Sequence, residues 1–209
     1  MQQSQVGKSM LKVNALAFDY IDKAVFRDVQ FSLEAGKLLH LQGGNGVGKT
    51  TLLKLLAGLL QPSSGEIFWN NIAINDDLPS WQQRICYIGH KLGLSSDLTI
   101  KENCYFDLHW QRRPVSFADL LKSFNLTELA DVPCSKLSQG QKRRAALLRI
   151  AMTDARVWLL DEPFVALDKP SMNALADCLK QHLADNGLIV MTSHQSLADC
   201  FDAYEVYSL

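Results

Sequence analysis

The 209-residue sequence has neither a long apolar run nor an excess of charge of one sign. No uninterrupted apolar stretch approaches the roughly 18 residues of a membrane span, so a role at a membrane would need spans from another chain. Lys and Arg number 21 against 22 Asp and Glu, which gives no support for a nucleic-acid binder that works through bulk positive charge. Residues 1–10 lack the apolar segment of a signal peptide, and we expect a polar leader before a single domain over residues 11–209.

The cysteines form neither a metal motif nor a recognisable disulfide framework. They are odd in number, stand far apart and contain no C-x-x-C pair: Cys86, Cys104, Cys134, Cys178 and Cys200. Reduced and mostly buried thiols in a cytosolic protein are therefore expected. Neither a zinc site nor covalent haem attachment is indicated.

The sequence does contain a glycine-rich loop between an apolar strand and an apolar helix. It reads Gly43-Gly44-Asn45-Gly46-Val47-Gly48-Lys49-Thr50-Thr51 and fits the phosphate-binding pattern G-x-x-x-x-G-K-[ST]. Glycines let the backbone approach a phosphate chain, and the helix start offers N–H groups and the positive end of its dipole. Lys49 would reach the β- and γ-phosphates of ATP, and the Thr50 hydroxyl would ligate Mg²⁺. The alternative, a glycine-rich turn before a core helix, leaves the Lys-Thr-Thr run unexplained.

Two carboxylates follow a short apolar strand further along the chain. Residues 157–160 read Val-Trp-Leu-Leu, as expected of a strand buried on both faces of a parallel sheet, and Asp161 and Glu162 come next. Ligands gather at the carboxyl ends of parallel strands, so both acids should lie beside the glycine loop. Asp161 would hold Mg²⁺ through water, and Glu162 would orient and deprotonate an attacking water. Two exposed acids at a strand end are the simpler alternative.

The rest of the pattern predicts an α/β fold with an antiparallel β subdomain and an inserted α-helical subdomain. Alternating apolar residues over 11–33 indicate two strands joined by a turn near Tyr20. Further strands are predicted at 66–69, 73–74, 85–88, 188–192 and 204–207. Helices are predicted near 100–110, 116–124, 141–152 and 170–184, the first three within a helical subdomain at about 97–152.

The segment Leu137-Ser138-Gln139-Gly140-Gln141 opens the third of these helices. Ser138 is a good N-cap, and Gly140 leaves the helix start open to an anion. On its own the segment is only a capped helix. Its position, 23 residues before Asp161, makes it more specific.

Together these motifs resemble those of the ABC ATPases, a family of P-loop nucleotide hydrolases. Five motifs fall in the family's order: Walker A at 43–50, the signature at 137–141, Walker B at 157–163, the D-loop at 166–168 and the switch histidine at 192–194. The signature reads LSQGQ, where the family most often has LSGGQ. The resemblance implies an ABC nucleotide-binding domain that works in pairs. Each ATP would lie between the glycine loop of one copy and Ser138 and Gly140 of the other.

The resemblance also implies roles for single residues. Tyr20 matches the aromatic that stacks on adenine, His194 matches the histidine that contacts the γ-phosphate, and Asp168 matches the acid that joins the two sites. His90 stands where the family has its lid glutamine, a residue that touches Mg²⁺ and water and relays the nucleotide state. An imidazole can change its charge between pH 5 and 8. For Tyr20 and His90 the alternatives are a surface tyrosine and an ordinary loop histidine.

Within the family, Ile88-Gly89-His90 and the segments 161–164 and 192–195 resemble the ATP-binding subunits of bacterial cytochrome c maturation (haem exporter) complexes. That resemblance implies a peripheral ATPase on the cytoplasmic face of the inner membrane. It would form an ATP-sandwich homodimer, bind a membrane-spanning permease subunit and support release of a haem-loaded chaperone, and no nucleic-acid partner is expected. A patch in the helical subdomain would either dock that partner or form the subdomain's own core: Tyr105, Phe106, His109 and Trp110.

Four other functions remain open from the residues. An ATPase subunit of a different bacterial ABC transporter would carry the same motifs. A soluble ABC ATPase would normally show coiled coils or two cassettes in one chain, and neither is visible. A small-molecule P-loop kinase would leave the signature unexplained, and a module that binds nucleotide without turnover would not need Glu162.

Overall fold

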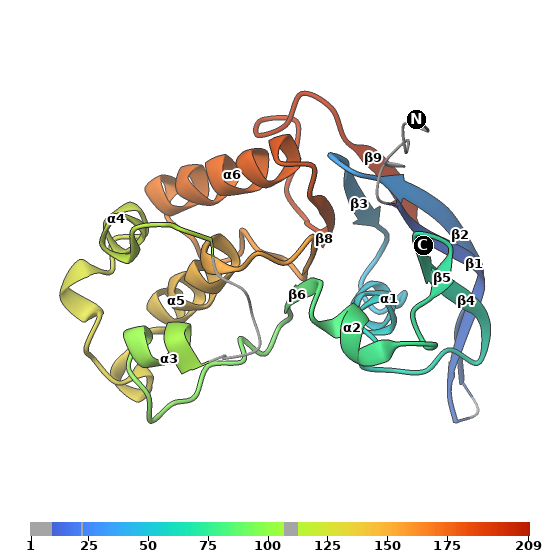
Figure 1. Ribbon diagram of the computed structural model, residues 1–209, viewed down its shortest axis with the longest axis horizontal. Helices are drawn as coiled ribbons and strands as arrows, with labels where there is room; N and C mark the ends of the chain where they lie inside the picture. Colours follow the sequence, from blue (N-terminus) through green and yellow to red (C-terminus); the bar gives the residue numbers. More distant parts are fainter. Residues whose placement is uncertain (1–9, 22, 107–112) are drawn as a thin grey trace, which may run out of the picture.

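The computed structural model describes residues 10–21, 23–106 and 113–209, and its strands form two separate sheets (Figure 1). The first is antiparallel, in the order β2-β1-β4-β5, with β1 at Met10–Tyr20, β2 at Lys23–Glu34, β4 at Ser64–Trp69 and β5 at Ile72–Ala73. The second is parallel, in the order β6-β7-β8-β3-β9, with β3 at Leu38–Gln42, β6 at Ile85–Ile88, β7 at Val157–Leu160, β8 at Leu188–Thr192 and β9 at Glu205–Ser208.

The helices lie on both sides of the parallel sheet (Figure 1). Helix α1, Lys49–Leu56, lies between the two sheets, and its leucines pack into the same core as the inner faces of both. The others are α2 at Leu78–Gln82, α3 at Ile100–Phe106, α4 at Phe117–Ser123, α5 at Gln139–Met152 and α6 at Lys169–Ala184. Helices α3 to α6 cover the opposite side of the parallel sheet and carry the second core. This α/β architecture confirms the predicted fold class.

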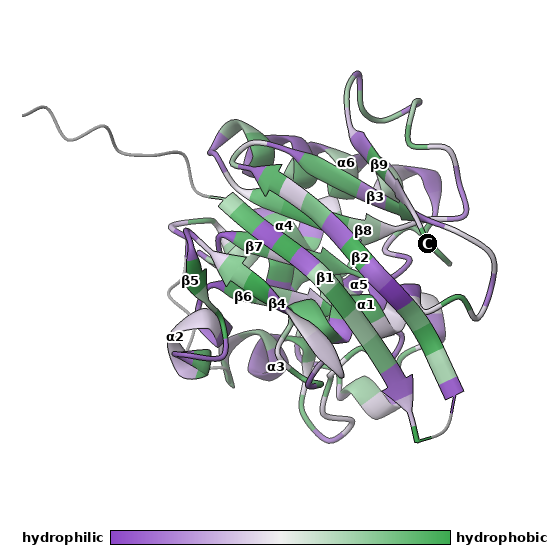
Figure 2. Ribbon diagram, turned by 90° about the vertical axis from the view of Figure 1, so that its right-hand side faces the viewer, coloured by the Kyte–Doolittle hydropathy of each residue, from purple (hydrophilic) through white to green (hydrophobic). Residues whose placement is uncertain are grey.

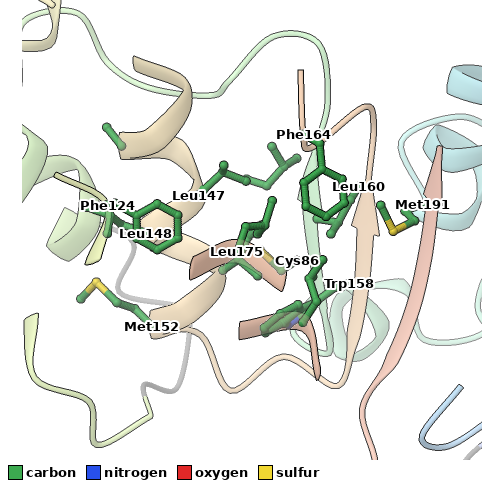
Figure 3. Packing of buried hydrophobic residues seen from close by; sticks show 14 of the residues in the cluster. Cys86, Phe124, Leu147, Leu148, Met152, Trp158, Leu160, Phe164, Leu175 and Met191 are labelled. Atoms are coloured by element: carbon green, nitrogen blue, oxygen red, sulfur yellow. The ribbon is translucent and has the colours of Figure 1, made fainter. Parts of the chain in front are cut away.

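Strand β7 shows why the parallel sheet needs a continuous apolar sequence. Its side chains alternate between the two cores. Val157 and Leu159 belong to the core that contains α1, and Trp158 and Leu160 belong to the core of α5 and α6, where Figure 3 shows them. All four are fully buried, because helices cover both faces.

Strand β2 follows a different rule because the antiparallel sheet covers the core with one face only. Phe26, Val29 and Leu33 are buried, and the residues between them are largely exposed. Figure 2 shows the resulting alternation of hydrophobic and hydrophilic residues along β1 and β2.

A histidine is stacked against the core tryptophan of β7. The ring of His182 lies parallel to Trp158 with centroids 3.7 Å apart, and the Arg113 guanidinium lies 3.0 Å from His182 Nδ1. A Cβ on Gly187 would lie 2.2 Å from the imidazole, so only glycine leaves room for it. Burial, and secondarily the charge of Arg113, lower the pKa of His182 to about 3. The ring is therefore neutral and acts as a packing element.

The strand order brings four loops to one edge of the molecule. Strands β6, β7, β8 and β3 are consecutive neighbours and all run parallel. The segments that follow them therefore leave the sheet at the same edge, and they contain the glycine loop, His90, the Asp161-Glu162 pair and His194.

The predicted elements are present within a few residues of their expected bounds, except that the predicted end of the helix near 100–110 lies outside the described residues. Three short helices were not predicted: α2 and the 3-10 helices at Thr127–Leu129 and Cys134–Lys136. Helix α2 has five residues, which are too few to show helical periodicity. It is fixed instead by Asp77, which caps it, and by Trp81, which is buried and donates to the Leu56 carbonyl at 2.9 Å. None of the helices in the described ranges has the length and apolar composition that crossing a membrane requires. The predicted polar leader lies outside these ranges apart from Met10, the first residue of β1.

Candidate active site

The glycine loop depends on backbone conformations that side chains disfavour. Gly48 caps α1 with φ 110°, and a Cβ there would lie 2.6 Å from Val25 Cγ1 of strand β2. Gly43 has φ 144°, and its Cβ would lie 3.0 Å from the Leu209 carbonyl oxygen. Both positions therefore need glycine for the dihedral angle and for the available space. The antiparallel sheet and the chain after β9 thus shape the loop from outside.

Lys49 reaches back over the loop from the first turn of α1. Its Nζ donates to the carbonyl oxygens of Gly43 at 2.7 Å and of Gly44 at 3.0 Å. An ammonium has three N–H donors, so one remains for an anion held by the loop. The positive charge and the N-terminus of α1 lie on the same side of the loop, which makes it suitable for binding phosphate groups.

Asp161 connects the loop to the end of two strands. Its side chain accepts from Thr50 Oγ1 at 2.7 Å through Oδ2 and from Thr192 Oγ1 at 2.9 Å through Oδ1. Asp161 is 2% exposed and Thr192 is fully buried. Thr192 was not predicted as a site residue, although it is the last residue of β8 and the first of the predicted switch segment at 192–194. Its hydroxyl sets the orientation of both acids, because it also accepts from the Glu162 backbone N–H at 2.9 Å.

The same oxygens test whether Mg²⁺ fits this edge. A hydroxyl and a carboxylate are hard oxygen donors, and Mg²⁺ commonly combines one or two such groups with water and substrate phosphates. In the described part of the chain, no cluster of three or more His, Cys, Asp and Glu side chains forms a complete metal site. Thr50 and Asp161 therefore fit a metal that arrives together with phosphate oxygens.

Glu162 is held in a strained conformation at the edge of the cleft. Its φ is +52°, a left-handed value that is uncommon for a residue with a side chain. Its Oε2 accepts from the His194 backbone N–H at 3.1 Å, and its Oε1 lies 3.6 Å from His194 Nε2. Oε1 is buried and accepts no hydrogen bond. One carboxylate oxygen is therefore positioned by the backbone, and the other remains available for chemistry.

Arg143 fixes the two acids from behind, and sequence reasoning did not give it this role. Its guanidinium donates to the carbonyl oxygens of Asp161, at 2.8 Å, and of Glu162. Arg143 is only 8% exposed. Burial lowers its pKa, and the charges of Asp161 and Glu162 oppose this, so the guanidinium stays charged. The one indication available from the sequence was that Arg143 falls among the apolar positions of α5, the positions that are buried.

The cleft brings most of the predicted site residues together. It has a volume of about 570 Å³ and is lined by Asp161, Glu162, His194, His90 and Tyr20 together with most of the glycine loop, from which Gly43, Gly44 and Val47 are missing. We call it the main cleft. Tyr20 is 48% exposed, and its ring makes an edge contact with Phe18 at 4.8 Å between centroids. The exposed face of the Tyr20 ring is therefore open to a planar base bound in the cleft.

The structure does not bring Ser138, Gly140 and Asp168 into this cleft. Ser138 forms a capping box with Gln141, accepting from its N–H at 3.2 Å and donating its own N–H to Oε1 at 2.8 Å. Asp168 caps α6 through Ser171 N–H at 3.0 Å and pairs with Arg144 at 3.0 Å. The predicted N-cap is thus confirmed, whereas a nucleotide contact from these residues stays a prediction.

The predicted aromatic patch is described only in part. His109 and Trp110 lie outside the described residues. Phe106 is 75% exposed and Tyr105 is 40% exposed, with the Tyr105 ring 5.3 Å from Phe117. The exposure of Phe106 disfavours the alternative in which it belongs to the core of the helical region.

Comparison with known proteins identifies the family. The profile of the family described as "ABC transporter" matches residues 26–165. A protein of Legionella pneumophila (strain Lens), "Cytochrome c biogenesis ATP-binding export protein CcmA", is 47% identical over 200 residues, which cover 96% of this chain and all of the relative. The protein of the same name from Escherichia coli O157:H7 is 37% identical over 188 residues and 90% of each chain.

Solved structures support the fold. The chain aligns with an ATP-binding subunit of an ABC transporter with a TM-score of 0.81, at 24% identity, covering 94% of this chain and 85% of the other. It also aligns with a dimeric ATP-binding cassette in a post-hydrolysis state, bound to ADP and Pi. That alignment has a TM-score of 0.80 at 23% identity and covers 95% and 94% of the two chains.

Proposed function

The chain belongs to the CcmA family of ABC transporter ATP-binding proteins, and from this premise we propose that it is the ATP-hydrolysing subunit of a membrane complex that supports cytochrome c maturation. The observation that carries the enzymatic part is the arrangement around Glu162. The buried Glu162 carboxylate lines the cleft that contains the glycine loop. One of its oxygens accepts a hydrogen bond from a backbone N–H, and the other accepts none.

Binding would use the loop and the aromatic end of the cleft. The backbone of residues 43–51 and the Lys49 ammonium hold the phosphates, and Tyr20 stacks on the adenine ring. Thr50 and Asp161 would hold Mg²⁺, which supplies charge neutralisation at the β- and γ-phosphates when it is bound.

Hydrolysis would place a water between Glu162 Oε1 and the γ-phosphate. Glu162 takes a proton from the water while the water oxygen bonds to the γ-phosphorus. The bond between that phosphorus and the bridging oxygen breaks, and ADP leaves with the bridging oxygen. His194 lies beside the same carboxylate and would contact the γ-phosphate oxygens. His90, two residues after β6, lines the cleft and would act as the lid residue.

The second half of the site would come from another copy of the chain. Ser138 and Gly140 lie outside the main cleft, and Ser138 and Gln139 are exposed at the start of α5. Two copies in opposite orientation would close each ATP between one glycine loop and the other copy's helix start, with Asp168 near the junction. The dimeric state of the solved ATP-binding cassette supports this proposal.

The membrane part of the proposal comes from the relatives' names. The relatives are called cytochrome c biogenesis ATP-binding export proteins, which supports a membrane-spanning, CcmB-like permease as the partner, with this chain bound to it at the cytoplasmic face of the inner membrane. ATP turnover would then drive release of a haem-loaded chaperone. An ABC transporter with a different substrate is the second candidate, because the site residues are shared by both.

A complementation experiment tests the proposal. In a bacterium that lacks its own CcmA gene, this chain should restore c-type cytochromes, detected by haem staining of membrane proteins. The Glu162→Gln variant should fail at equal expression, and Glu128→Gln, at an exposed site in the short turn after α4, should succeed. Restoration by Glu162→Gln would refute the catalytic assignment. Failure of the unaltered chain, together with co-purification of an unrelated permease, would favour the second candidate.

A further inference from the structure

A second cavity shares Glu162 with the main cleft but is not lined by the glycine loop. Its volume is about 630 Å³, within the usual range for small-molecule sites. It is bounded by the segment after β6, the first turns of α5 and the segment after Glu162. The apolar part of its wall comes mainly from Leu92, Leu94 and Val165. The two cavities share Glu162 and His90 in their linings, so they meet at the position of bond cleavage.

The charges in the second cavity favour an anion. Three permanent cations line it, Lys91, Lys142 and Arg143, against the single carboxylate of Glu162. Over the described ranges, neither Lys91 nor Lys142 takes part in an ion pair. The charge of Lys142 acts on Cys134, which also lines the cavity. Burial raises the pKa of the Cys134 thiol, and the hydrogen bond from Asn103 and the charge of Lys142 oppose that rise.

A buried donor without a partner points to the same class of ligand. Arg143 Nε is buried and makes no hydrogen bond, although the Nη atoms of the same guanidinium hold the carbonyl oxygens behind Glu162. Buried polar atoms are normally satisfied by protein or by ordered solvent or ligand. An oxyanion suits an unpaired guanidinium N–H and two lysines, since charge-assisted hydrogen bonds are the strongest available here.

We propose that the second cavity binds inorganic phosphate, the product of the proposed hydrolysis, as it leaves the main cleft past Glu162 and His90. This inference rests on the proposed function for the source of the phosphate. The binding site itself rests on the lining alone. A larger amphipathic anion would use the same cations together with the apolar wall. Because the cavity shares Glu162 and His90 with the main cleft, the small product formed beside those residues is the ligand favoured here.

Direct titration of inorganic phosphate into the full-length chain tests the site. Lys49→Ala removes the ammonium of the glycine loop, and calorimetry should still detect phosphate binding to this variant. Adding Lys91→Gln and Lys142→Gln to Lys49→Ala should weaken that binding at least fivefold. Lys142→Arg, which keeps the charge, should preserve most of it. Lys122→Gln with Lys180→Gln, two exposed lysines on α4 and α6, is the matched control for net charge and should have no effect.

Absence of phosphate binding in the Lys49→Ala chain would overturn the inference, as would binding that is unaffected by loss of Lys91 and Lys142.

Steady-state ATP hydrolysis provides an independent measurement. Phosphate should inhibit the wild type without competing with ATP, and its inhibition constant should rise at least fivefold in the Lys91→Gln/Lys142→Gln variant. Purely competitive inhibition would place phosphate only in the main cleft. If the wild type does not hydrolyse ATP, the proposed function fails, and the titration still decides on the cavity.

Discussion

Thr192 offers a quantitative test of how the catalytic edge is held. Its hydroxyl donates to Asp161 Oδ1 and accepts from the Glu162 N–H, both at 2.9 Å, and the residue is fully buried. Thr192→Val keeps the shape of the side chain and removes both hydrogen bonds. No cavity forms, so any effect is polar in origin.

The magnitude follows from the two bonds. A hydrogen bond to a charged group contributes about 1.5–3 kcal/mol, and one between neutral groups about 0.5–1.5 kcal/mol. We expect Thr192→Val to lower the free energy of unfolding by about 3 kcal/mol. For a chain of this size that corresponds to a fall in melting temperature of roughly 6–12 °C. ATP turnover should fall further than stability alone explains, because Glu162 loses the anchor of its strained backbone.

Urea unfolding and steady-state ATP hydrolysis measure the two effects. Thr192→Ser is the matched control, since it keeps the hydroxyl and loses one methyl group, at a cost of about 1 kcal/mol. The serine variant should retain most of the activity. If valine proves as stable as threonine to within 0.5 kcal/mol, or if serine is the more damaging change, the polar network does not hold the edge as described.

The remaining predictions concern the loop, the core histidine and the lid position. Gly48→Ala should lower the free energy of unfolding in urea by about 2–4 kcal/mol, because its Cβ would meet Val25. Gly46 has φ 81°, but no atom lies within 4 Å of an added Cβ, so Gly46→Ala should cost at least about 1 kcal/mol less. His182 has a pKa of about 3 in the folded chain, below its ordinary value, so the unfolded chain binds more protons and stability falls as pH drops from about 6.5 towards 3. Between pH 6.5 and 5 the wild type should lose about 2 kcal/mol more than His182→Phe, which keeps the aromatic stack; equal losses would exclude His182 as the cause. His90→Gln should keep ATP binding and hydrolysis, because glutamine is the residue that the family has at the lid position, and loss of ATP binding in this variant would contradict the lid assignment.

The features that could be predicted from the sequence depend on short spacings. The glycine loop needs glycines at fixed positions before Lys49, and Asp161 and Glu162 directly follow an apolar strand. Strand order then brings these segments together without further information, because parallel strands end at a common edge. The confirmed fold class and family rest on these local patterns. The roles of the individual site residues remain predictions.

What the sequence did not show depends on long-range packing. Arg143 reads as one of several basic residues on α5, and only the packing of that helix behind β7 directs its guanidinium to the carbonyl groups of both acids. The His182–Trp158 stack joins residues from different elements and leaves no periodic signal. The second cavity is likewise assembled from three separate segments, so its charge balance is visible only in the folded chain.

The central claim is that ATP is hydrolysed in a site shared by two copies of the chain. Analytical ultracentrifugation of the Glu162→Gln variant with ATP and Mg²⁺ tests it most directly. We predict a dimer that retains two unhydrolysed ATP molecules and returns to monomer when Ser138→Arg is added, although each monomer still binds ATP through Lys49. A Glu162→Gln chain that binds ATP and stays monomeric, or a dimer that is indifferent to Ser138→Arg, would contradict the shared site.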